Sequence, residues 1–263
     1  MKENQTDKIR QLVRGRYAKA AEGSGCGCNS ENTSSCCGSS EDIAQIMGYS
    51  PEELGSVVEG ANLDLGCGNP TTIGKLAPGE IVLDLGSGGG FDCFLAAKKV
   101  GDKGRVIGVD MTPEMLSKAR KNAVKMGATN VEFRLGEIEH LPVADNSIDV
   151  IISNCVINLS PEKRKVFQDA YRALKPSGRL AISDVVATTE MPDQLREQAA
   201  LLTGCIAGAE HIDRIRNLLD EVGFRDVKIE LKAYSKELVS SWFPGSGAED
   251  YVASANIRAF KPL

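Results

Sequence analysis

The centre of this 263-residue chain reads Val82-Leu83-Asp84-Leu85-Gly86-Ser87-Gly88-Gly89-Gly90. Its apolar start predicts a buried strand over 81–85, and the glycines permit a tight turn that a ligand can approach closely. A helix is predicted over 91–100, and the next strand ends at Asp110, 20 residues after Gly90. A strand, a glycine-rich turn, a helix and a distal acid are typical of nucleotide-type loops, in which the acid accepts hydrogen bonds from ribose hydroxyls.

Strands and helices continue to alternate on both sides of this loop. Further strands are predicted over 105–109, 131–135, 148–153 and 178–186, with helices over 113–126 and 160–174. This rhythm predicts an α/β fold of Rossmann-like type, with a doubly wound, mostly parallel sheet. Three parts are expected: a helix and a flexible Cys/Gly/Ser-rich segment over 1–40, the ligand-binding domain over 41–190, and a small α+β part over 191–263 that covers the substrate.

A second loop resembles the first. Residues 63–68 read Leu63-Asp64-Leu65-Gly66-Cys67-Gly68, but Pro70 follows at once. No helix and acid-ended strand separate this loop from the central one, so it lacks the context of a nucleotide loop. We therefore expect cofactor binding at 84–90 and a different role for 64–70.

The composition limits the range of partners. The net charge is −5 and the isoelectric point about 5.3, which argues against a nucleic acid or an anionic membrane as the main partner. No apolar run approaches the roughly 18 residues of a membrane span, and the polar start is unlike a secretory signal. A cytoplasmic protein is expected, in which the eight cysteines are mostly thiols.

Three cysteines stand on separate segments, namely Cys67, Cys155 and Cys205. None has the CxxC spacing of a zinc ribbon. Three converging thiolates would suit one soft acceptor such as trivalent arsenic. The alternative is that each is a small buried hydrophobe, which is the preferred interpretation for Cys93, inside its predicted helix.

Two further features concern the ligand of the central loop. Asp84 precedes the first glycine by two residues, where a carboxylate would repel a pyrophosphate and favour a cationic ligand group, so a dinucleotide is disfavoured. The segment 136–142 follows the third strand, at the carboxyl edge where open α/β sheets bind ligands. There Ile138 is expected to pack on an adenine and Glu137 to accept from its amino group.

Together these motifs resemble the class I S-adenosylmethionine methyltransferases over about residues 78–186. The segments around the three cysteines, Gly66-Cys67-Gly68-Asn69-Pro70, Ile152–Leu159 and Gly204–Ala209, resemble the arsenite methyltransferase family over about 36–245. The resemblance implies transfer of a methyl group from S-adenosyl-L-methionine to trivalent arsenic for detoxification. The expected cofactor-binding residues are Asp84, Gly86, Ser87, Gly88, Asp110, Met111, Glu137, Ile138 and Asn154.

The family has four functional cysteines. Three correspond to Cys67, Cys155 and Cys205, which are expected to hold the arsenic, and the fourth to Cys36 or Cys37, between which the sequence does not decide. The resemblance implies that Cys67 forms a redox disulfide with Cys36 or Cys37, and that thioredoxin or glutathione reduces it. Thiol–disulfide exchange is the chemistry of that step.

Three alternatives remain open from sequence. A methyltransferase for a small organic acceptor would need a base to deprotonate a hydroxyl, and none is evident. A metalloid-binding protein on an inactive methyltransferase fold would not need the intact cofactor loop. An NAD-linked dehydrogenase is the least favoured, because of Asp84.

Overall fold

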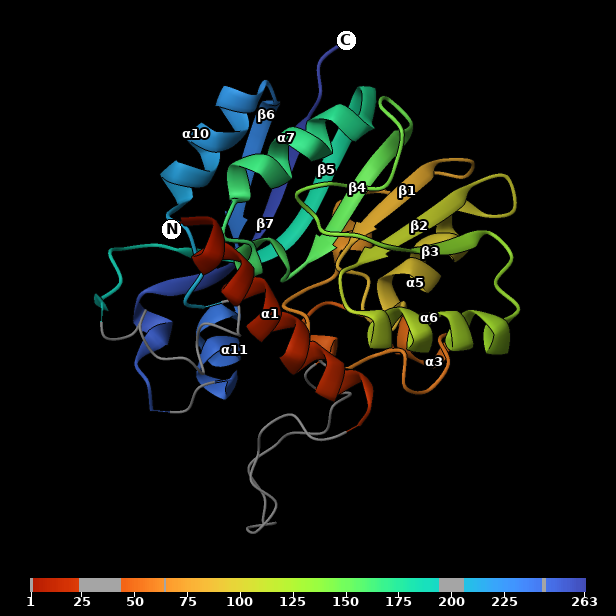
Figure 1. Ribbon diagram of the computed structural model, residues 1–263, viewed down its shortest axis with the longest axis horizontal. Helices are drawn as coiled ribbons and strands as arrows, with labels where there is room; N and C mark the ends of the chain where they lie inside the picture. Colours follow the sequence, from red (N-terminus) through yellow and green to blue (C-terminus); the bar gives the residue numbers. More distant parts are fainter. Residues whose placement is uncertain (1, 24–43, 64, 194–205, 243–244) are drawn as a thin grey trace.

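A computed structural model describes residues 2–23, 44–63, 65–193, 206–242 and 245–263. Seven strands form one sheet in the order β3-β2-β1-β4-β5-β7-β6, and β7 alone runs antiparallel to its neighbours (Figure 1). The strands are β1 (Ile81–Leu85), β2 (Arg105–Asp110), β3 (Val131–Leu135), β4 (Ile148–Asn154), β5 (Leu174–Ala187), β6 (Arg225–Leu231) and β7 (Val252–Phe260). The predicted Rossmann-like, doubly wound sheet is thereby confirmed.

Helices cover both faces of the sheet. Along β1, Val82 packs with α5 and α6, whereas Leu83 and Leu85 pack with α7 and α10, because successive side chains of a strand point to opposite faces. Figure 1 shows α7 and α10 together on the near face. The helices are α1 (Lys2–Ala21), α3 (Pro51–Gly55), α4 (Pro70–Ile73), α5 (Phe91–Val100), α6 (Pro113–Met126), α7 (Lys163–Ala173), α10 (Ile212–Val222) and α11 (Ser235–Trp242), with short 3-10 turns η1 (Ile157–Leu159) and η2 (Ala248–Asp250).

Some boundaries differ from the sequence-based ones. α7 begins at Lys163 rather than next to Ser160, because the Ser160 hydroxyl donates to Glu139 at 2.6 Å and its oxygen accepts from Glu162 N. β5 starts at Leu174 rather than at the predicted residue 178.

The C-terminal residues extend the same sheet. β7 lies between β5 and β6, and its 252–260 stretch pairs with 179–187 of β5. The sequence did not predict β7 or α11. Residues 212–260 thus supply β6 and β7, together with the helices α10 and α11. The division of the chain into three parts remains a prediction.

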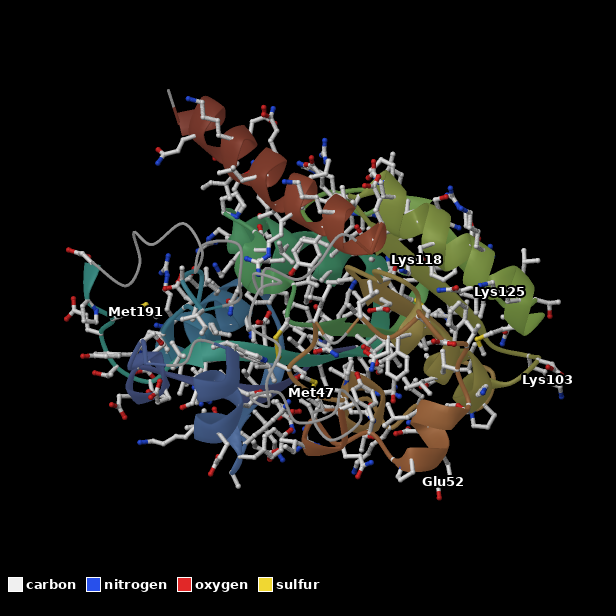
Figure 2. The ribbon with its side chains drawn as sticks, turned by 90° about the horizontal axis from the view of Figure 1, so that it is seen from below. Met47, Glu52, Lys103, Lys118, Lys125 and Met191 are labelled. Atoms are coloured by element: carbon white, nitrogen blue, oxygen red, sulfur yellow. A yellow bond between two sulfur atoms is a disulfide. The ribbon has the colours of Figure 1, made fainter. Side chains whose placement is uncertain are left out.

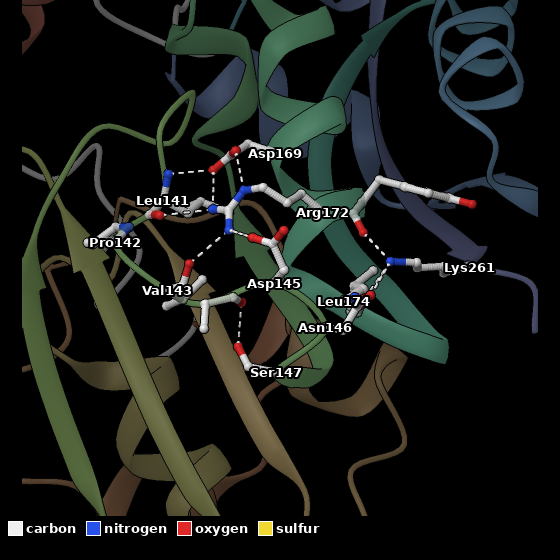
Figure 3. Close-up of polar contacts among 12 residues, drawn as sticks. Leu141, Pro142, Val143, Asp145, Asn146, Ser147, Asp169, Arg172, Leu174 and Lys261 are labelled. Carbon is white, nitrogen blue, oxygen red and sulfur yellow. Dashed lines mark hydrogen bonds and ion pairs between the residues drawn. The ribbon is translucent and has the colours of Figure 1, made fainter.

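Polar contacts of α7 hold the connection from β3 to β4. Arg172 donates to the carbonyls of Leu141 and Val143 and to the carboxylates of Asp145 and Asp169 (Figure 3). Asp169 also accepts from Leu141 N at 2.5 Å. These bonds fix the loop that follows the predicted adenine-binding residues.

None of the described helices combines the length and the apolar character that crossing a membrane requires.

Candidate functional site

A cavity opens at the carboxyl ends of β1, β2 and β4. It contains about 1100 Å³ of space between atoms, including the part open to solvent. α1 borders it through Arg10, Val13 and Tyr17, and Figure 2 shows α1 lying along α6 near Lys118, whose Nζ donates to the carbonyl of Ala21 at 3.1 Å. Seven predicted cofactor-binding residues line the cavity, namely Gly86, Ser87, Gly88, Asp110, Met111, Ile138 and Asn154.

The glycine-rich turn has the backbone that its sequence predicts. Gly86, Gly88 and Gly90 have φ values of 70°, 50° and 92°, in the left-handed region that favours glycine. A methyl group at Gly90 would lie 2.8 Å from the Phe94 ring. Ser87 Oγ is buried and has no hydrogen-bond partner among the described residues. An unpaired hydroxyl in a turn bordering the cavity fits a polar ligand.

Asp110 ends β2 at the cavity wall. Its carboxylate accepts from Gly88 N at 2.9 Å and from Thr112 N at 2.8 Å, so it ties the glycine turn to the start of α6. Burial raises the pKa of Asp110, and these backbone bonds oppose the rise. The placement is compatible with the predicted role as acceptor for ribose hydroxyls.

Asp84 lies behind the turn and is not among the cavity-lining residues. It is 2% exposed, and Cys93 Sγ donates to it at 3.1 Å. Burial, followed by the nearby charge of Asp92, raises the pKa of Asp84 well above its usual range. Strand alternation explains this position, because Asp84 points to the α5 face of the sheet together with Val82.

Asp92 is a further acid that lines the cavity, and the sequence analysis missed it. Its carboxylate accepts from Tyr49 Oη at 2.7 Å and from Asn154 Nδ2 at 3.1 Å. Burial raises the pKa of Asp92 to about 6, partly offset by these two bonds. The position next to the turn, at the start of α5, was the only signal in the sequence that it could be near a ligand.

Asn154 connects this cluster to the first glycine loop. Its Nδ2 donates to Gly68 O at 2.7 Å, and its Oδ1 accepts from Cys67 N at 2.9 Å. Gly66 and Leu65 also line the cavity. The loop at 64–70 therefore forms one wall of the ligand cavity, which fits a role other than holding phosphates; Asp64 itself lies outside the described residues.

The predicted adenine segment is only partly at the wall. Ile138 lines the cavity, as does Glu139, which was not predicted. Glu139 is 4% exposed and bonds Arg10 Nη2 at 3.0 Å. Glu137 is not among the lining residues and lies 3.5 Å and 3.6 Å from the guanidinium groups of Arg10 and Arg14.

Two predicted thiols meet behind the cavity. Cys67 and Cys155 form a disulfide with a Cα–Cα distance of 5.9 Å, although 88 residues separate them. Cys155 has a left-handed backbone, with φ of 56°, and its N donates to Ser183 O at 2.8 Å. A carboxylate oxygen of Asp184 and the two sulfurs lie within 4.8 Å of one another, a grouping that could hold a soft ion once the disulfide is open.

The remaining functional cysteines were not placed. Cys205, Cys36 and Cys37 lie outside the described residues. The partner of Cys67 in the structure is Cys155, whereas the sequence-based pairing with Cys36 or Cys37 remains a prediction.

A polar group that the sequence did not indicate surrounds Cys67. Lys232 Nζ donates to Cys67 O at 2.9 Å and to Ser183 Oγ at 2.6 Å, and Ser254 Oγ donates to the same carbonyl. Burial lowers the pKa of Lys232 to about 7. Lys232 was not predicted as a site residue, because it lies in a C-terminal region without a recognisable motif.

Comparison with known proteins places this site in a family. The family described as "Methyltransferase domain" matches residues 76–223. An arsenite methyltransferase of Halobacterium salinarum is 52% identical over 97% of this chain and 67% of its own length, and one of Aquipseudomonas alcaligenes is 40% identical over 84% and 63%. The crystal structure of an arsenic(III) S-adenosylmethionine methyltransferase from Chlamydomonas reinhardtii is 36% identical, with a TM-score of 0.63, covering 84% of this chain and 73% of that one.

The chain spans about two thirds of the length of these curated relatives. The glycine turn, Asp110 and Cys155 lie within the region of the methyltransferase family match, whereas the part of the cavity wall between Arg10 and Gly66 precedes it. The predicted resemblance is confirmed: the chain belongs to the methyltransferase domain family and, within it, to the arsenite methyltransferase family.

Proposed function

We propose that the protein transfers a methyl group from S-adenosyl-L-methionine to trivalent arsenic, arsenite or methylarsenite, bound by cysteine thiolates. One observation carries the proposal. Cys67 and Cys155 meet although they are distant in sequence, and Cys155 lines the same cavity as the glycine turn. Thiolates are the ligands that soft, polarizable ions prefer. Cys205 is the proposed third ligand.

The residues of the cavity divide into two groups. Asp110 and Met111 belong to the proposed binding surface of the adenosyl part, with Ile138 against the adenine. Asp92, with Tyr49 and Asn154, supplies the negative charge that a methionine ammonium group requires. The cofactor supplies an electrophilic methyl group bound to a sulfonium sulfur.

The choice of arsenic over an organic acceptor is supported by the bonding of the cavity acids in the described part of the chain: Asp92, Asp110 and Glu139 each accept bonds from neighbouring protein groups. An arsenic lone pair carries no proton, whereas a hydroxyl acceptor must lose one. Asp92 is a cavity carboxylate with a pKa raised to about 6, yet both of its oxygens accept bonds from Tyr49 and Asn154. In that arrangement Asp92 is suited to bind a ligand rather than to act as the general base that takes a proton from a hydroxyl acceptor.

The disulfide supports a redox role for the thiols. Methyl transfer to the lone pair oxidises arsenic by two electrons, and two thiols that close into a disulfide return two electrons. Cys67 and Cys155 are close enough for this, and Cys36 or Cys37 remains the alternative partner for Cys67. Thioredoxin or glutathione is the proposed reductant, in the cytoplasm, and removal of arsenic the proposed role.

The decisive test is arsenic speciation after incubation with arsenite, a thiol and S-adenosylmethionine. Cys155→Ser and Cys205→Ser are each expected to lose methylation of arsenite. Cys93→Ser is the matched control, because its hydroxyl can still donate to Asp84 and Cys93 is not an arsenic ligand in this proposal. Retained activity in either of the first two variants would refute the assignment.

Cys67→Ser separates the two methylations. We expect loss of the first methylation, on arsenite, with some residual second methylation, because methylarsenite requires one thiolate fewer. The measurement is the rate on each substrate separately. Wild-type rates on both would contradict a ligand or redox role for Cys67.

Calorimetric titration with S-adenosylmethionine tests the remaining alternative. An inactive scaffold that only binds metalloid would show no cofactor binding, whereas the proposed enzyme binds the cofactor without arsenic present.

A further inference from the structure

The two sulfurs of the disulfide lie in different surroundings. Both cysteines are buried, with 2% of Cys155 and 0% of Cys67 exposed, but Cys155 lines the cofactor cavity and Cys67 does not. A small thiol that enters through the cavity therefore meets Cys155 first. Attack on a disulfide proceeds along the sulfur–sulfur axis, so attack on Cys155 expels Cys67.

A hydrogen-bonded pair stands on the other side, next to Cys67. Lys232 directly follows β6, and its Nζ lies 2.6 Å from Ser183 Oγ, which in turn lies 3.4 Å from Cys67 Sγ. Ser183 is fully buried in β5. The three groups form a continuous chain from an ammonium to a sulfur.

The direction of both hydrogen bonds follows from the chemistry of the groups. Protonated Lys232 has three donors and no acceptor, so Ser183 Oγ accepts from it. The sulfur of a disulfide carries no hydrogen, so Ser183 donates its own hydrogen toward Cys67. The hydroxyl is thereby polarised toward the sulfur, and charge-assisted bonds of this kind are stronger than neutral ones.

The ammonium has no direct ion pair. Among the described residues, no carboxylate lies within ion-pair distance of Lys232, whose second acceptor is the Cys67 carbonyl, and the charge of Asp184 acts on it without direct contact. A largely buried cation is costly when its charge is only partly compensated. A thiolate at Cys67 would add a negative charge that Ser183 connects to Lys232.

We propose that Lys232 and Ser183 are positioning residues that make Cys67 the leaving sulfur when a thiol opens the Cys67–Cys155 disulfide. The attacking thiolate forms a bond to Cys155 Sγ, the bond between the two cysteine sulfurs breaks, and its electron pair leaves on Cys67. No proton moves in this step, because Ser183 donates a hydrogen bond to the new thiolate. A second thiol then attacks the attacking sulfur of the mixed disulfide, which releases Cys155 and one oxidised thiol pair.

Peptide mapping can identify which of the two cysteines carries the mixed disulfide, because proteolysis places them in different peptides. Cleavage after glutamates places Cys67 alone among cysteines in peptide 60–80 and Cys155 alone in peptide 140–162. The full-length protein is oxidised, and the linked pair of peptides confirms the starting disulfide. It is then treated briefly with 2-mercaptoethanol, quenched with acid, and its free thiols are alkylated before digestion and mass spectrometry.

In the parent protein we expect mercaptoethanol on Cys155 and the alkylating group on Cys67, with a preference of about tenfold or more. Lys232→Met and Ser183→Ala are each expected to bring the two sites to within about threefold of each other and to slow the opening by about tenfold. Lys236→Met removes an exposed lysine of α11 and is the charge control, for which the parent pattern is expected. Ser183→Ala removes one oxygen only, so it serves if Lys232→Met fails to fold.

Three results would overturn the proposal: a preference for Cys67 in the parent, an unchanged preference in both folded variants, or no Cys67–Cys155 peptide pair after oxidation. A purely structural role of Lys232 would alter stability without altering which sulfur carries the adduct. The experiment contains neither arsenic nor methyl donor, so its outcome is independent of the proposed function.

Discussion

Asp84 and Asp92 are two buried carboxyl groups near the glycine turn. Burial raises the pKa of both, and the charge of Asp92 adds to the rise at Asp84. A cationic group in the cavity would relieve part of this repulsion. We therefore expect negative charge at Asp92 to cost stability in the free protein and to favour a positively charged ligand.

This cost appears in the pH dependence of stability. The pKa of Asp92 is raised to about 6 in the folded state from 3.8, so the folded protein binds more protons than the unfolded chain between these values. The free energy of unfolding should therefore fall as the pH rises from 3.8 to 6, by about 3 kcal/mol from this group.

Asp92→Asn cannot ionise and should lack that fall. The measurement is the free energy of unfolding in urea for both proteins at several pH values between 4 and 7. Only the change with pH is compared, so a constant difference in stability caused by altered hydrogen bonds does not affect the result. Parallel pH profiles for the two proteins would contradict the assigned pKa.

Asp110 should govern cofactor affinity. Asp110→Asn removes the charge but keeps one acceptor oxygen, so the dissociation constant for S-adenosylmethionine should rise by about tenfold or more, the value of a charge-assisted bond. Calorimetric titration measures it. Asp102→Asn, in an exposed turn, should bind as the parent does, and equal affinities for all three proteins would remove Asp110 from the site.

Among single residues, the sequence predicted the positions of those that belong to one local motif. Asp110 and the glycines follow from the loop itself, and all of them lie where expected. Asp84 was misplaced, because spacing in sequence does not say which face of a strand a side chain takes. Asp92, Lys232 and Ser183 could not be predicted, because their partners are brought together only by the packing of distant segments.

The N-terminal helix borders the cavity. Arg10 bonds Glu139 at 3.0 Å and Glu162 at 2.9 Å, and Val13 is buried. Arg10, Val13 and Glu139 all line the cavity, so these ion pairs hold α1 against its wall. We expect this helix to act as a closure that must move when the cofactor enters and leaves.

Arg10→Gln should loosen this closure. Glu139 would then lack its cation in a site where it is 4% exposed, and the cofactor should dissociate about tenfold faster. Stopped-flow displacement measures the rate. Arg14→Gln is the control on the same helix, because Arg14 is 43% exposed and lies 3.6 Å from Glu137, so its change should stay below about twofold. Equal rates for the two variants would exclude a closing role for Arg10.

Elements with a strong local signal were predicted well. α5 begins at Phe91 and α6 at Pro113, as the sequence predicted. The start of α7 was misjudged, because Ser160 bonds Glu139 from another segment. β7 was missed although residues 253–259 alternate between apolar and polar side chains, because most of its apolar residues are alanines, which give a weak strand signal.

For the whole molecule, the order of the strands makes the C-terminus essential. β5 pairs with β7 along 179–187, and β7 contributes the buried side chains of Ala255, Ile257 and Ala259 to the core. Without β6 and β7, β5 would become an exposed edge, and such edges promote aggregation.

Removal of residues 224–263 should therefore abolish folding rather than only activity. We expect aggregation in size-exclusion chromatography and no cooperative thermal transition. Removal of residues 262–263 alone is the control, since Leu263 is fully exposed and Lys261, which bonds the carbonyl of Leu174, is kept. A soluble shortened protein that still binds the cofactor would show that the last two strands are dispensable.

The parallel half of the sheet was predictable because strand and helix patterns alternate along it. The antiparallel strand was not, because its place between β5 and β6 depends on a pairing across 65 or more residues, from Ala187 to Val252. The same limit applies to the disulfide, whose two cysteines are close only because the loop at 64–70 packs against the end of β4.

Gly68 adds a constraint on how such a site can change over evolutionary time. A methyl group at this position would overlap both Lys232 Nζ and Ser183 Oγ. A lineage that acquired a larger residue at position 68 would have to shorten or displace the lysine at once, and one that lost the lysine would keep only Ser183 Oγ as an obstacle at position 68. The two positions, 164 residues apart, should therefore be inherited as a unit, and replacing both together should harm folding less than replacing the glycine alone.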